Sequence, residues 1–488
     1  MIAASHPIVS CDEARELEAR LFGGDEAKEW AAMRQAGRAI TEAVLRDFEE
    51  IGGFQSRGRV LVLVGKGHNG GDALIAATEV LRRFPEATAD VVFVWGERAM
   101  RPLAQRAWRE ALHTGRFEVK AVERMSRSYE LCLDGIFGFQ FRPPAEERVK
   151  SLIEQANALA VRLRAAVDLP SARLFRADFT YATGSVKRPV IESDVAGRVR
   201  YLDLGFFSSE RGPSGERVLT PAVLGRLAGL RESRSDKRSF RHVFVLAGSR
   251  NYPGAAMMTV QAALKAGAGL VTAFVPESVA AAFAAQVPEA IWVAWPETPE
   301  GGLALEGESL LRERIQRADA LVIGPGLGRE PETLALVKGV VANATAPVVL
   351  DADALQREFV RAVKSPCIVT PHAGEFERIA GGKALEEFAA ETGAVVVLKG
   401  PVTRIANAET VYHSFYGGPV LARGGSGDLL AGMIGTMLAQ NSNDAVLAGA
   451  RGVVWHGLAA EALARRRGQV AVRTTEVLEE LGVVLRDL

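Results

Sequence analysis

Short apolar runs alternate with longer stretches of helical period along most of the chain. Residues 59–64 (RVLVLV), 90–95 and 165–169 are rich in β-branched side chains, whereas residues 73–84 show the spacing of an amphipathic helix. A second alternating series begins at residue 242, with further strands predicted at residues 269–275, 320–323, 347–350, 367–370 and 394–399. This alternation predicts parallel sheets whose strands are joined by crossover helices.

A polar segment separates the two series. After residues 199–205 the chain becomes rich in Ser, Arg and Gly, and it is most polar at residues 231–239 (RESRSDKRS). Such a composition is typical of a linker between domains, and we place the boundary between residues 207 and 238. We therefore predict an α/β protein with two three-layer αβα domains, the first of them Rossmann-like, at residues 1–225 and 226–488.

Composition narrows the classes of partner. The 488 residues contain 59 Lys and Arg against 59 Asp and Glu, so no net charge attracts nucleic acid or an anionic membrane. The cysteines, Cys11, Cys132 and Cys367, are too few and too far apart for a disulfide framework or a paired-cysteine metal site. The first residues contain no basic leader, and no run of about 18 apolar residues occurs. We expect a cytoplasmic protein that binds small molecules rather than nucleic acid or membranes.

Residues 423–431 (RGGSGDLLA) place three glycines, a hydroxyl and a carboxylate before an apolar helix, which we predict at residues 429–439. Glycines expose backbone N–H groups, and a helix N-terminus adds the positive end of its dipole, so anions bind well there. Asp428 is a poor anion ligand, but it suits a base that takes a proton from a hydroxyl attacking phosphorus. An aspartate that merely caps the helix is the structural alternative.

Other turns of the second series also end predicted strands with small or polar residues. Ligands of open parallel sheets bind at the carboxyl ends of the strands, so these turns and the GGSGD loop are expected to line one cleft. The turns are GSRNYPGA from Gly248, GPGLG from Gly324, DADAL from Asp351, TPHAGE from Thr370 and KGPVT from Lys399.

Taken together, these turns resemble those of the ribokinase-like superfamily, and more closely those of its NAD(P)H-hydrate dehydratase branch. The resemblance covers residues 237–488. It rests on residues 237–271 (KRSFRHVFVLAGSRNYPGAAMMTVQAALKAGAGLV) and on GPGLG, TPHAGEFERI, LKGPVT and GGSGDLLAG. It implies a ribokinase-like αβα fold for the second domain.

The resemblance also implies a reaction. Bacterial members use ADP to phosphorylate the hydroxyl of a hydrated nicotinamide ring, and the ring nitrogen then expels phosphate; Mg²⁺ usually accompanies such transfers. By resemblance, Asp428 is the base. Without the resemblance, His372 would be a helix cap or surface residue and Lys399 a solvated charge. The resemblance assigns Lys399, Gly400, Pro401, Val402, Thr403 and Gly427 to the nucleotide, and Ala255, Gly326 and His372 to the hydrate.

In the amino-terminal half, Gly65, Gly67 and Gly70 form a GxGxxG pattern between a strand and a helix. This pattern is the fingerprint of dinucleotide-binding dehydrogenases. However, Asp72 would lie where the pyrophosphate must bind, and Glu97 comes too late to be the acidic residue that follows the second strand. A conventional dehydrogenase is therefore disfavoured.

Residues 1–225 instead resemble the NAD(P)H-hydrate epimerase domain that is found fused to the dehydratase. The resemblance rests on MRQAGRA from Met33, GKGHNGGD from Gly65, LDGIFG from Leu133, VDLPS from Val167 and ADFTYATGSVK from Ala177. By resemblance, Asp168 transfers the protons that interconvert the two ring epimers, although an aspartate that caps the following turn is the alternative. The resemblance assigns potassium to Asn69, Asp134 and Ser171, whose oxygen atoms suit a hard cation. It assigns the hydrate to His68, Asn69, Gly70, Gly71, Asp72, Gly138, Phe139, Gln140, Phe141, Arg142 and Asp168.

This half departs from the epimerase pattern in several places. His68 and Ala73 stand at the ends of a loop that usually reads NNGGDG, and FGFQF replaces FGTGL. The DxPSG motif ends in Ala172, and Arg34 replaces a common acidic residue. An added Cβ can close a pocket or shift a backbone that needs a positive φ. The potassium-ligand residues are retained, so we predict an active epimerase.

In the order of its halves the chain resembles a fused bifunctional enzyme that repairs the hydrates of NADH and NADPH with ADP, K⁺ and Mg²⁺. Related proteins generally assemble, so a homo-oligomer is expected. The alternative is an ATP-dependent small-molecule kinase of the ribokinase-like superfamily with a non-catalytic amino-terminal ligand-binding module. The sequence alone does not distinguish ADP from ATP, or the NADH hydrate from the NADPH hydrate.

Overall fold

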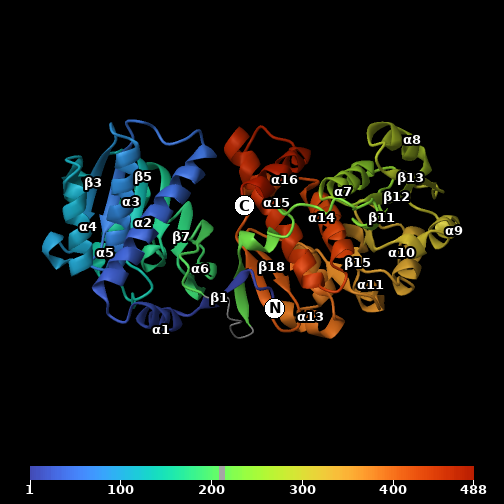
Figure 1. Ribbon diagram of the computed structural model, residues 1–488, viewed down its shortest axis with the longest axis horizontal. Coiled ribbons are helices and arrows are strands. Elements are labelled where there is room, and N and C mark those ends of the chain that lie inside the picture. Colours follow the sequence, from blue (N-terminus) through green and yellow to red (C-terminus); the bar gives the residue numbers. More distant parts are fainter. Residues whose placement is uncertain (208–214) are drawn as a thin grey trace. The chain divides into compact units, whose positions relative to one another are not determined.

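The computed structural model describes residues 1–207 and 215–488, which form two compact units (Figure 1). No helix in the described part of the chain is long and apolar enough to cross a membrane. Part of the expected boundary segment, residues 208–214, lies outside the described residues. The amino-terminal unit comprises His6–Glu210 and Ala464–Gly468, and the carboxyl-terminal unit comprises Met1–Ser5, Arg211–Leu463 and Gln469–Leu488.

The amino-terminal unit is built on a sheet with the strand order β4-β3-β2-β5-β6-β7-β9. Every pairing within it is parallel, as the alternation of strands and helices predicts. A short parallel pair of β1 with β8 lies outside this order. The strands are β1 (Ser5–Val9), β2 (Arg59–Val64), β3 (Thr88–Phe93), β4 (Phe117–Val119), β5 (Ser128–Gly135), β6 (Ala160–Val167), β7 (Phe179–Thr183), β8 (Val186–Lys187) and β9 (Arg198–Leu202).

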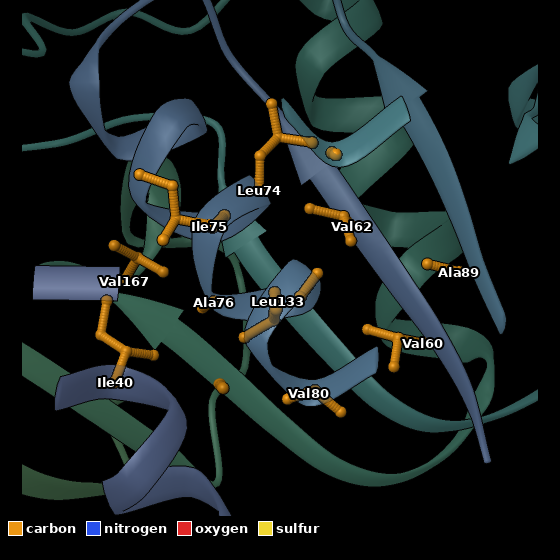
Figure 2. Close-up of a cluster of buried hydrophobic side chains, with 14 of the residues drawn as sticks. Ile40, Val60, Val62, Leu74, Ile75, Ala76, Val80, Ala89, Leu133 and Val167 are labelled. Atoms are coloured by element: carbon orange, nitrogen blue, oxygen red, sulfur yellow. The ribbon is translucent and has the colours of Figure 1, made fainter. Parts of the chain in front are cut away.

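Alternate side chains of β2 divide the core of this unit between two faces of the sheet. Val60 and Val62 pack with apolar residues of α2, α3 and α4, whereas Leu61 and Leu63 pack with α5. Figure 2 shows part of the first cluster, where Ile40 of α2 lies near side chains of α3 and of the strands. Helices therefore cover both faces, which confirms the three-layer αβα architecture. The helices are α1 (Cys11–Phe22), α2 (Glu26–Glu49), α3 (His68–Arg83), α4 (Pro102–Leu112), α5 (Glu147–Ala158) and α6 (Arg188–Ile191).

The sheet of the carboxyl-terminal unit has the order β13-β12-β11-β14-β15-β16-β17-β18-β19-β10. Pairing is parallel from β13 to β17, but β17-β18 and β18-β19 are antiparallel, an extension that the sequence reading did not include. Strand β10, which precedes residue 225, pairs with β19. The strands are β10 (Glu216–Leu219), β11 (His242–Leu246), β12 (Leu270–Pro276), β13 (Ile291–Trp295), β14 (Ala320–Ile323), β15 (Val348–Leu350), β16 (Cys367–Val369), β17 (Val395–Leu398), β18 (Thr403–Ala406) and β19 (Val411–Ser414).

Both faces of this sheet are also covered. Leu321 and Ile323 of β14 pack with helices α10 to α13, whereas Val322 between them faces α14. The approach of α14 is close, because a Cβ on Gly435 would lie 2.2 Å from Val322 Cγ2. The helices are α7 (Pro253–Lys265), α8 (Glu277–Gln286), α9 (Glu308–Arg312), α10 (Pro331–Ala342), α11 (Arg357–Ala362), α12 (Ala373–Ala380), α13 (Leu385–Thr392), α14 (Ser426–Gln440), α15 (Ala445–Arg467) and α16 (Val477–Arg486).

Two elements begin earlier than the apolar pattern predicts, and each has a physical reason. Strand β6 begins at Ala160 rather than residue 165, because Arg162 in its polar first half pairs with Glu130. Helix α3 begins at His68 rather than residue 73, because its glycines permit close packing. A Cβ on Gly71, for example, would lie 2.7 Å from the sulfur of Met33.

Candidate active sites

Asp428 lies in the first turn of α14, after a glycine turn that the sequence indicated. The N-cap position belongs to Gly425, which has a left-handed φ of 89° and supplies no capping side chain. A Cβ at Gly425 would also lie 2.4 Å from the sulfur of Met258. Asp428 is therefore not the N-cap residue, and its carboxylate is free for another role.

The ends of three neighbouring strands bring Lys399 to the glycine turn that precedes Asp428. Lys399 follows β17, and its Nζ donates to Asp351 Oδ1 at 2.9 Å at the end of β15. Thr370, after β16, donates its hydroxyl to the same oxygen at 2.7 Å. A Cβ built on Gly427 would lie 3.2 Å from Lys399 Nζ and 3.8 Å from Asp351 Oδ2. The ammonium group thus adjoins the glycine turn, as the clustering of strand ends predicted.

The electrostatics of this cluster favour proton transfer. Burial, followed by the charge of Asp351, raises the pKa of Asp428 to about 6, while Lys399 acts in the opposite direction. Burial lowers the pKa of Lys399, but the charge and hydrogen bond of Asp351 outweigh it and the pKa is raised. At neutral pH the Asp428 carboxyl is therefore mostly ionised, and a pKa this close to neutrality suits a general base.

The residues expected to contact the hydrate lie on two further turns. Gly326 has a φ of 64°, and a Cβ there would lie 2.8 Å from Ala255 Cβ, so these two residues adjoin. His372 is the N-cap of α12 and accepts a hydrogen bond from Glu375 N at 3.3 Å, as the structural alternative proposes, although its side chain is 61% exposed. A bridge between His372 and Lys399 joins this turn to the lysine.

Of the other expected nucleotide residues, Gly400, Pro401 and Val402 form the turn between β17 and β18, and Thr403 begins β18.

A cavity of about 670 Å³ opens in the amino-terminal unit beside the start of α3. Gly70, Gly71 and Arg142 are not among its lining residues. The two glycines are buried within α3, and Arg142 instead binds Asp12 Oδ1 at 2.9 Å. The expected residues that do line it are His68, Asn69, Asp72, Gly138, Phe139, Gln140, Phe141 and Asp168.

Asp168 forms a buried ion pair in this cavity. Its Oδ1 accepts from Lys187 Nζ at 2.5 Å, and the same nitrogen donates to Thr183 O at 3.0 Å. The two side chains are 3% and 2% exposed, and both line the cavity. The sequence reading did not single out Lys187. The available signal was a lysine directly after the small and apolar run ATGSV, in a strand too short to show a period.

Asn69, Asp134 and Ser171 meet around the backbone of Phe137. Asn69 Nδ2 donates to Phe137 O at 3.1 Å, and Ser171 Oγ accepts from Phe137 N at 2.9 Å. The Ser171 hydroxyl donates to Asp134 Oδ1 at 2.7 Å. Burial raises the pKa of Asp134 to about 6, and no Lys or Arg of residues 1–207 or 215–488 lies within 4.0 Å of its carboxylate. A buried carboxylate with oxygen-bearing neighbours and no cationic side chain fits a monovalent metal ion.

Two more carboxyl groups line the same cavity. Asp72 is buried, its Oδ1 has no hydrogen-bond partner in the described part of the chain, and burial raises its pKa well above the usual value. Glu18 of α1 was not predicted, and burial raises its pKa to about 7. Glu18 can therefore carry a proton near neutral pH.

Comparison with known proteins identifies a family for each half of the chain. Residues 243–482 match the NAD(P)H-hydrate dehydratase family, and residues 30–195 match the family described as YjeF-related protein N-terminus. A bifunctional NAD(P)H-hydrate repair enzyme of Gloeobacter violaceus is 37% identical over 505 residues, which cover 95% of this chain and 95% of the relative. The chain belongs to the family of bifunctional NAD(P)H-hydrate repair enzymes.

Other members of this repair-enzyme family are similarly distant. The enzyme of Moorella thermoacetica is 33% identical, over 93% of this chain and 92% of the relative. The enzyme of Mycobacterium tuberculosis is 31% identical, over 88% of this chain and 88% of the relative. Asp428 and Asp168 each lie within a matched segment, whereas Glu18 precedes both.

Two solved structures are also similar to parts of the chain. An ADP/ATP-dependent NAD(P)H-hydrate dehydratase from Bacillus subtilis is 29% identical. The match covers 53% of this chain and 93% of the dehydratase chain, with a TM-score of 0.45. A ribokinase-like superfamily protein from Enterococcus faecalis has 28% identity, covers 56% and 96%, and gives a TM-score of 0.49.

Proposed function

We propose that this chain repairs hydrated NADH and NADPH in two steps. The amino-terminal half, residues 1–225, interconverts the R and S hydrates, and residues 226–488 dehydrate the S hydrate at the expense of ADP, giving AMP and phosphate. The observation that carries this proposal is the ionisable Asp428 in a glycine turn beside Lys399, in a chain whose repair-enzyme relative covers 95% of it.

In the dehydration, Asp428 takes the proton of the ring hydroxyl while the hydroxyl oxygen attacks the β-phosphorus of ADP. The phosphorus–oxygen bond to AMP breaks, and the hydrate becomes a phosphate ester. The lone pair of the ring nitrogen then expels inorganic phosphate, and loss of a proton from the neighbouring carbon restores the C=C bond. Phosphate leaves far more readily than hydroxide, which explains the need for ADP. The raised pKa of Asp428 supports its role as the base.

Lys399 and the glycine turn stabilise the phosphoryl group during transfer. The Lys399 ammonium adjoins Gly427, where the N–H groups at the start of α14 and the helix dipole also favour negative charge. Mg²⁺ supplies further positive charge to a bound nucleotide, and it is commonly held by one or two carboxylates together with phosphate oxygens. Lys399, Gly400, Pro401, Val402, Thr403 and Gly427 form the proposed nucleotide site, and Ala255, Gly326 and His372 border the hydrate.

In the epimerisation, Asp168 transfers the protons that interconvert the two ring epimers. Its Oδ1 is bound to Lys187 Nζ, which holds a proton at hydrogen-bond distance inside the cavity. Because both side chains are almost fully buried, their orientation is fixed before the substrate arrives. We assign Lys187 to this site together with Asp168, as the group that keeps the carboxylate oriented.

Asn69, Asp134 and Ser171 would hold the potassium ion beside this cavity. Their oxygen atoms, the burial of Asp134 and the shared contacts with Phe137 support this assignment. The ion, when bound, supplies a fixed positive charge that compensates Asp134 and orders the loop that follows β5. The partners of the protein in the reaction are small molecules, in keeping with the zero net charge of the chain.

An assay with purified full-length protein tests the whole proposal. With mixed hydrates of NADH and ADP, we expect absorbance at 340 nm to grow until both epimers are consumed, whereas without ADP the R and S hydrates should only equilibrate. An ATP-dependent kinase would instead convert an alcohol into a stable phosphorylated product and leave the hydrates unchanged. Dehydration of the S hydrate alone, with no equilibration beyond the spontaneous rate, would make the amino-terminal half a non-catalytic module.

A further inference from the structure

Some cationic side chains that line the amino-terminal cavity form no ion pair with the described residues. Arg15, Lys66, Arg101 and Lys187 line the cavity. Arg15 forms an ion pair with Asp12, and Lys187 forms one with Asp168. Lys66 and Arg101 have no carboxylate within 4.0 Å in the part of the chain that the structure describes. Within the described residues these two exposed cations thus form no direct ion pair, although the charge of Lys66 contributes to the lowered pKa of Glu146.

These two cations lie on the same part of the cavity wall. Arg101 N donates to Lys66 O at 2.8 Å, which joins the two segments at the start of α3. The Lys66 ammonium lies 4.7 Å from the ring centroid of Trp95, another lining residue. Burial lowers the pKa of His68, the charge of Glu29 opposes this shift, and the charge of Arg101 adds to it, which places the guanidinium near the first residue of α3.

The surrounding structure adds further capacity for a polar ligand. The N-cap residue of α3, Gly67, provides no side-chain hydrogen bond, and the first N–H groups of a helix have no acceptor within the helix. An independent observation comes from Asp72, which is 8% exposed, lines the cavity and has an Oδ1 atom without a hydrogen-bond partner among residues 1–207 and 215–488. The cations without an ion pair and the free N–H donors indicate an anionic group on the ligand, and the unsatisfied Asp72 oxygen, which is an acceptor, indicates a donor such as a hydroxyl on the same ligand.

We propose that Lys66 and Arg101 form an anion subsite that binds a phosphate group of the hydrated dinucleotide. This inference rests on the proposed epimerase function and deepens it, because it identifies how the non-reacting part of the substrate is held. Two kinds of phosphate share this chemistry. Both hydrates carry a pyrophosphate, whereas the 2′-phosphate is present on the NADPH hydrate alone, so the subsite also bears on the choice between the two substrates.

Epimerisation kinetics of the full chain without added nucleotide test the subsite, because dehydration does not run under these conditions. Lys66→Gln and Arg101→Gln are each expected to raise KM about tenfold at unchanged kcat, the loss of one charge-assisted contact. A rise for both hydrates identifies the pyrophosphate, and a rise for the NADPH hydrate alone identifies the 2′-phosphate. The conservative variants Lys66→Arg and Arg101→Lys should keep KM within about threefold of the wild type. Arg98→Gln, which removes an exposed cation that does not line the cavity, is the matched control and should change nothing.

An unchanged KM for both hydrates in both glutamine variants would overturn the subsite, and so would a loss of kcat alone. A second measurement separates this inference from the epimerase function itself. Crystals of the full chain soaked with NADP⁺ should show phosphate density beside Lys66 and Arg101 even if the wild type failed to epimerise the hydrates. NADP⁺ density in the cavity with its phosphates elsewhere, or no density there, would also overturn it.

Discussion

Each unit places a carboxylate and a lysine at the ends of parallel strands, but the two pairs are connected differently. In the amino-terminal unit, Lys187 binds Asp168 directly at 2.5 Å, and both side chains are almost fully buried. In the carboxyl-terminal unit, Lys399 binds Asp351, and Asp428 lies beyond it in the glycine turn. A direct ion pair holds both charges in place, whereas an aspartate without one is governed by burial, which raises the pKa of Asp428 to about 6. The proposed base Asp428 thus has a pKa set mainly by burial, whereas the proposed proton-transfer residue Asp168 is held in place by its ion pair with Lys187.

The backbone differs between the sites as well. The left-handed residue before Asp428 is Gly425, which adopts φ 89° without a steric cost. Near the other pair, Asp168 itself has φ 66° and Ala172 has φ 55°. For residues with a Cβ this conformation costs roughly 1–2 kcal/mol. Part of the folding free energy of the amino-terminal unit is therefore spent on positioning this loop.

The largest effect is expected from Asp428→Asn. The amide keeps the shape of the side chain but cannot accept the proton, so dehydration should fall about 10²–10⁴-fold while ADP binding and epimerisation remain. The absorbance at 340 nm with the S hydrate and ADP measures the loss. If turnover stayed within about threefold of the wild type, the base would have to be another group.

The same variant also tests the electrostatics of the turn. A carboxyl group whose pKa is higher in the folded than in the unfolded state lowers stability as the pH rises from its ordinary pKa of 3.8 through about 6, and above that pH the loss is complete. Asp428→Asn removes this penalty. Its midpoint of thermal unfolding should therefore equal or exceed that of the wild type at pH 8, and lose any such advantage at pH 4.

The next largest effect is a difference between the two lysines in the folding free energy that is lost when each is replaced. Lys187→Met leaves Asp168 buried without its partner, which should cost about 3–5 kcal/mol of folding free energy and abolish epimerisation. Lys399→Met should cost less, because Lys399 is 22% exposed against 2% for Lys187 and water can reach the vacated space. Urea unfolding compares the two variants. The double variant Asp168→Asn with Lys187→Met should regain part of the loss, and equal costs for the two lysines would contradict the comparison.

Much of this arrangement could be predicted, because strand ends in a parallel sheet share one edge. The turns at Asp351, Thr370 and Lys399 end successive strands, so their meeting beside the GGSGD loop follows from the order of strands alone. The sequence showed the turn at Asp351 but not its role as the partner of Lys399, since that depends on side-chain reach across two strands.

Other features depend on contacts that no local pattern reveals. Lys187 lies on the two-residue strand β8, whose position follows from its pairing with β1. Glu18 lies on α1, which the search for strand and helix alternation did not include. The sequence shows that Ala172 replaces a glycine, but it does not show the effect on the backbone. In the structure the left-handed conformation persists with an alanine in place.

A smaller effect concerns the pH dependence of dehydration. Because Asp428 must be ionised, activity should be full well above pH 6 and should fall as the pH drops through about 6. Asp351→Asn removes a charge that raises the pKa of Asp428, so the acidic limb of the pH–rate profile should move to lower pH, with a lower maximal rate because Lys399 loses its partner. The profile of epimerisation in the same protein is the control. A limb that did not move would show that Asp351 and Asp428 are not coupled.

The smallest expected effect tests the strained loop beside Asp168. Ala172→Gly should stabilise the amino-terminal unit by up to about 1 kcal/mol, because glycine removes the cost of φ 55° but loses more conformational freedom on folding. The midpoint of thermal unfolding of this unit, followed by epimerase activity after heating, measures the gain. Ala177→Gly, at a nearby residue outside the left-handed region, should instead destabilise the unit. A loss of stability in Ala172→Gly as large as that of the control would mean that the loop stores no strain at residue 172, and that the difference between the two backbones has no energetic consequence.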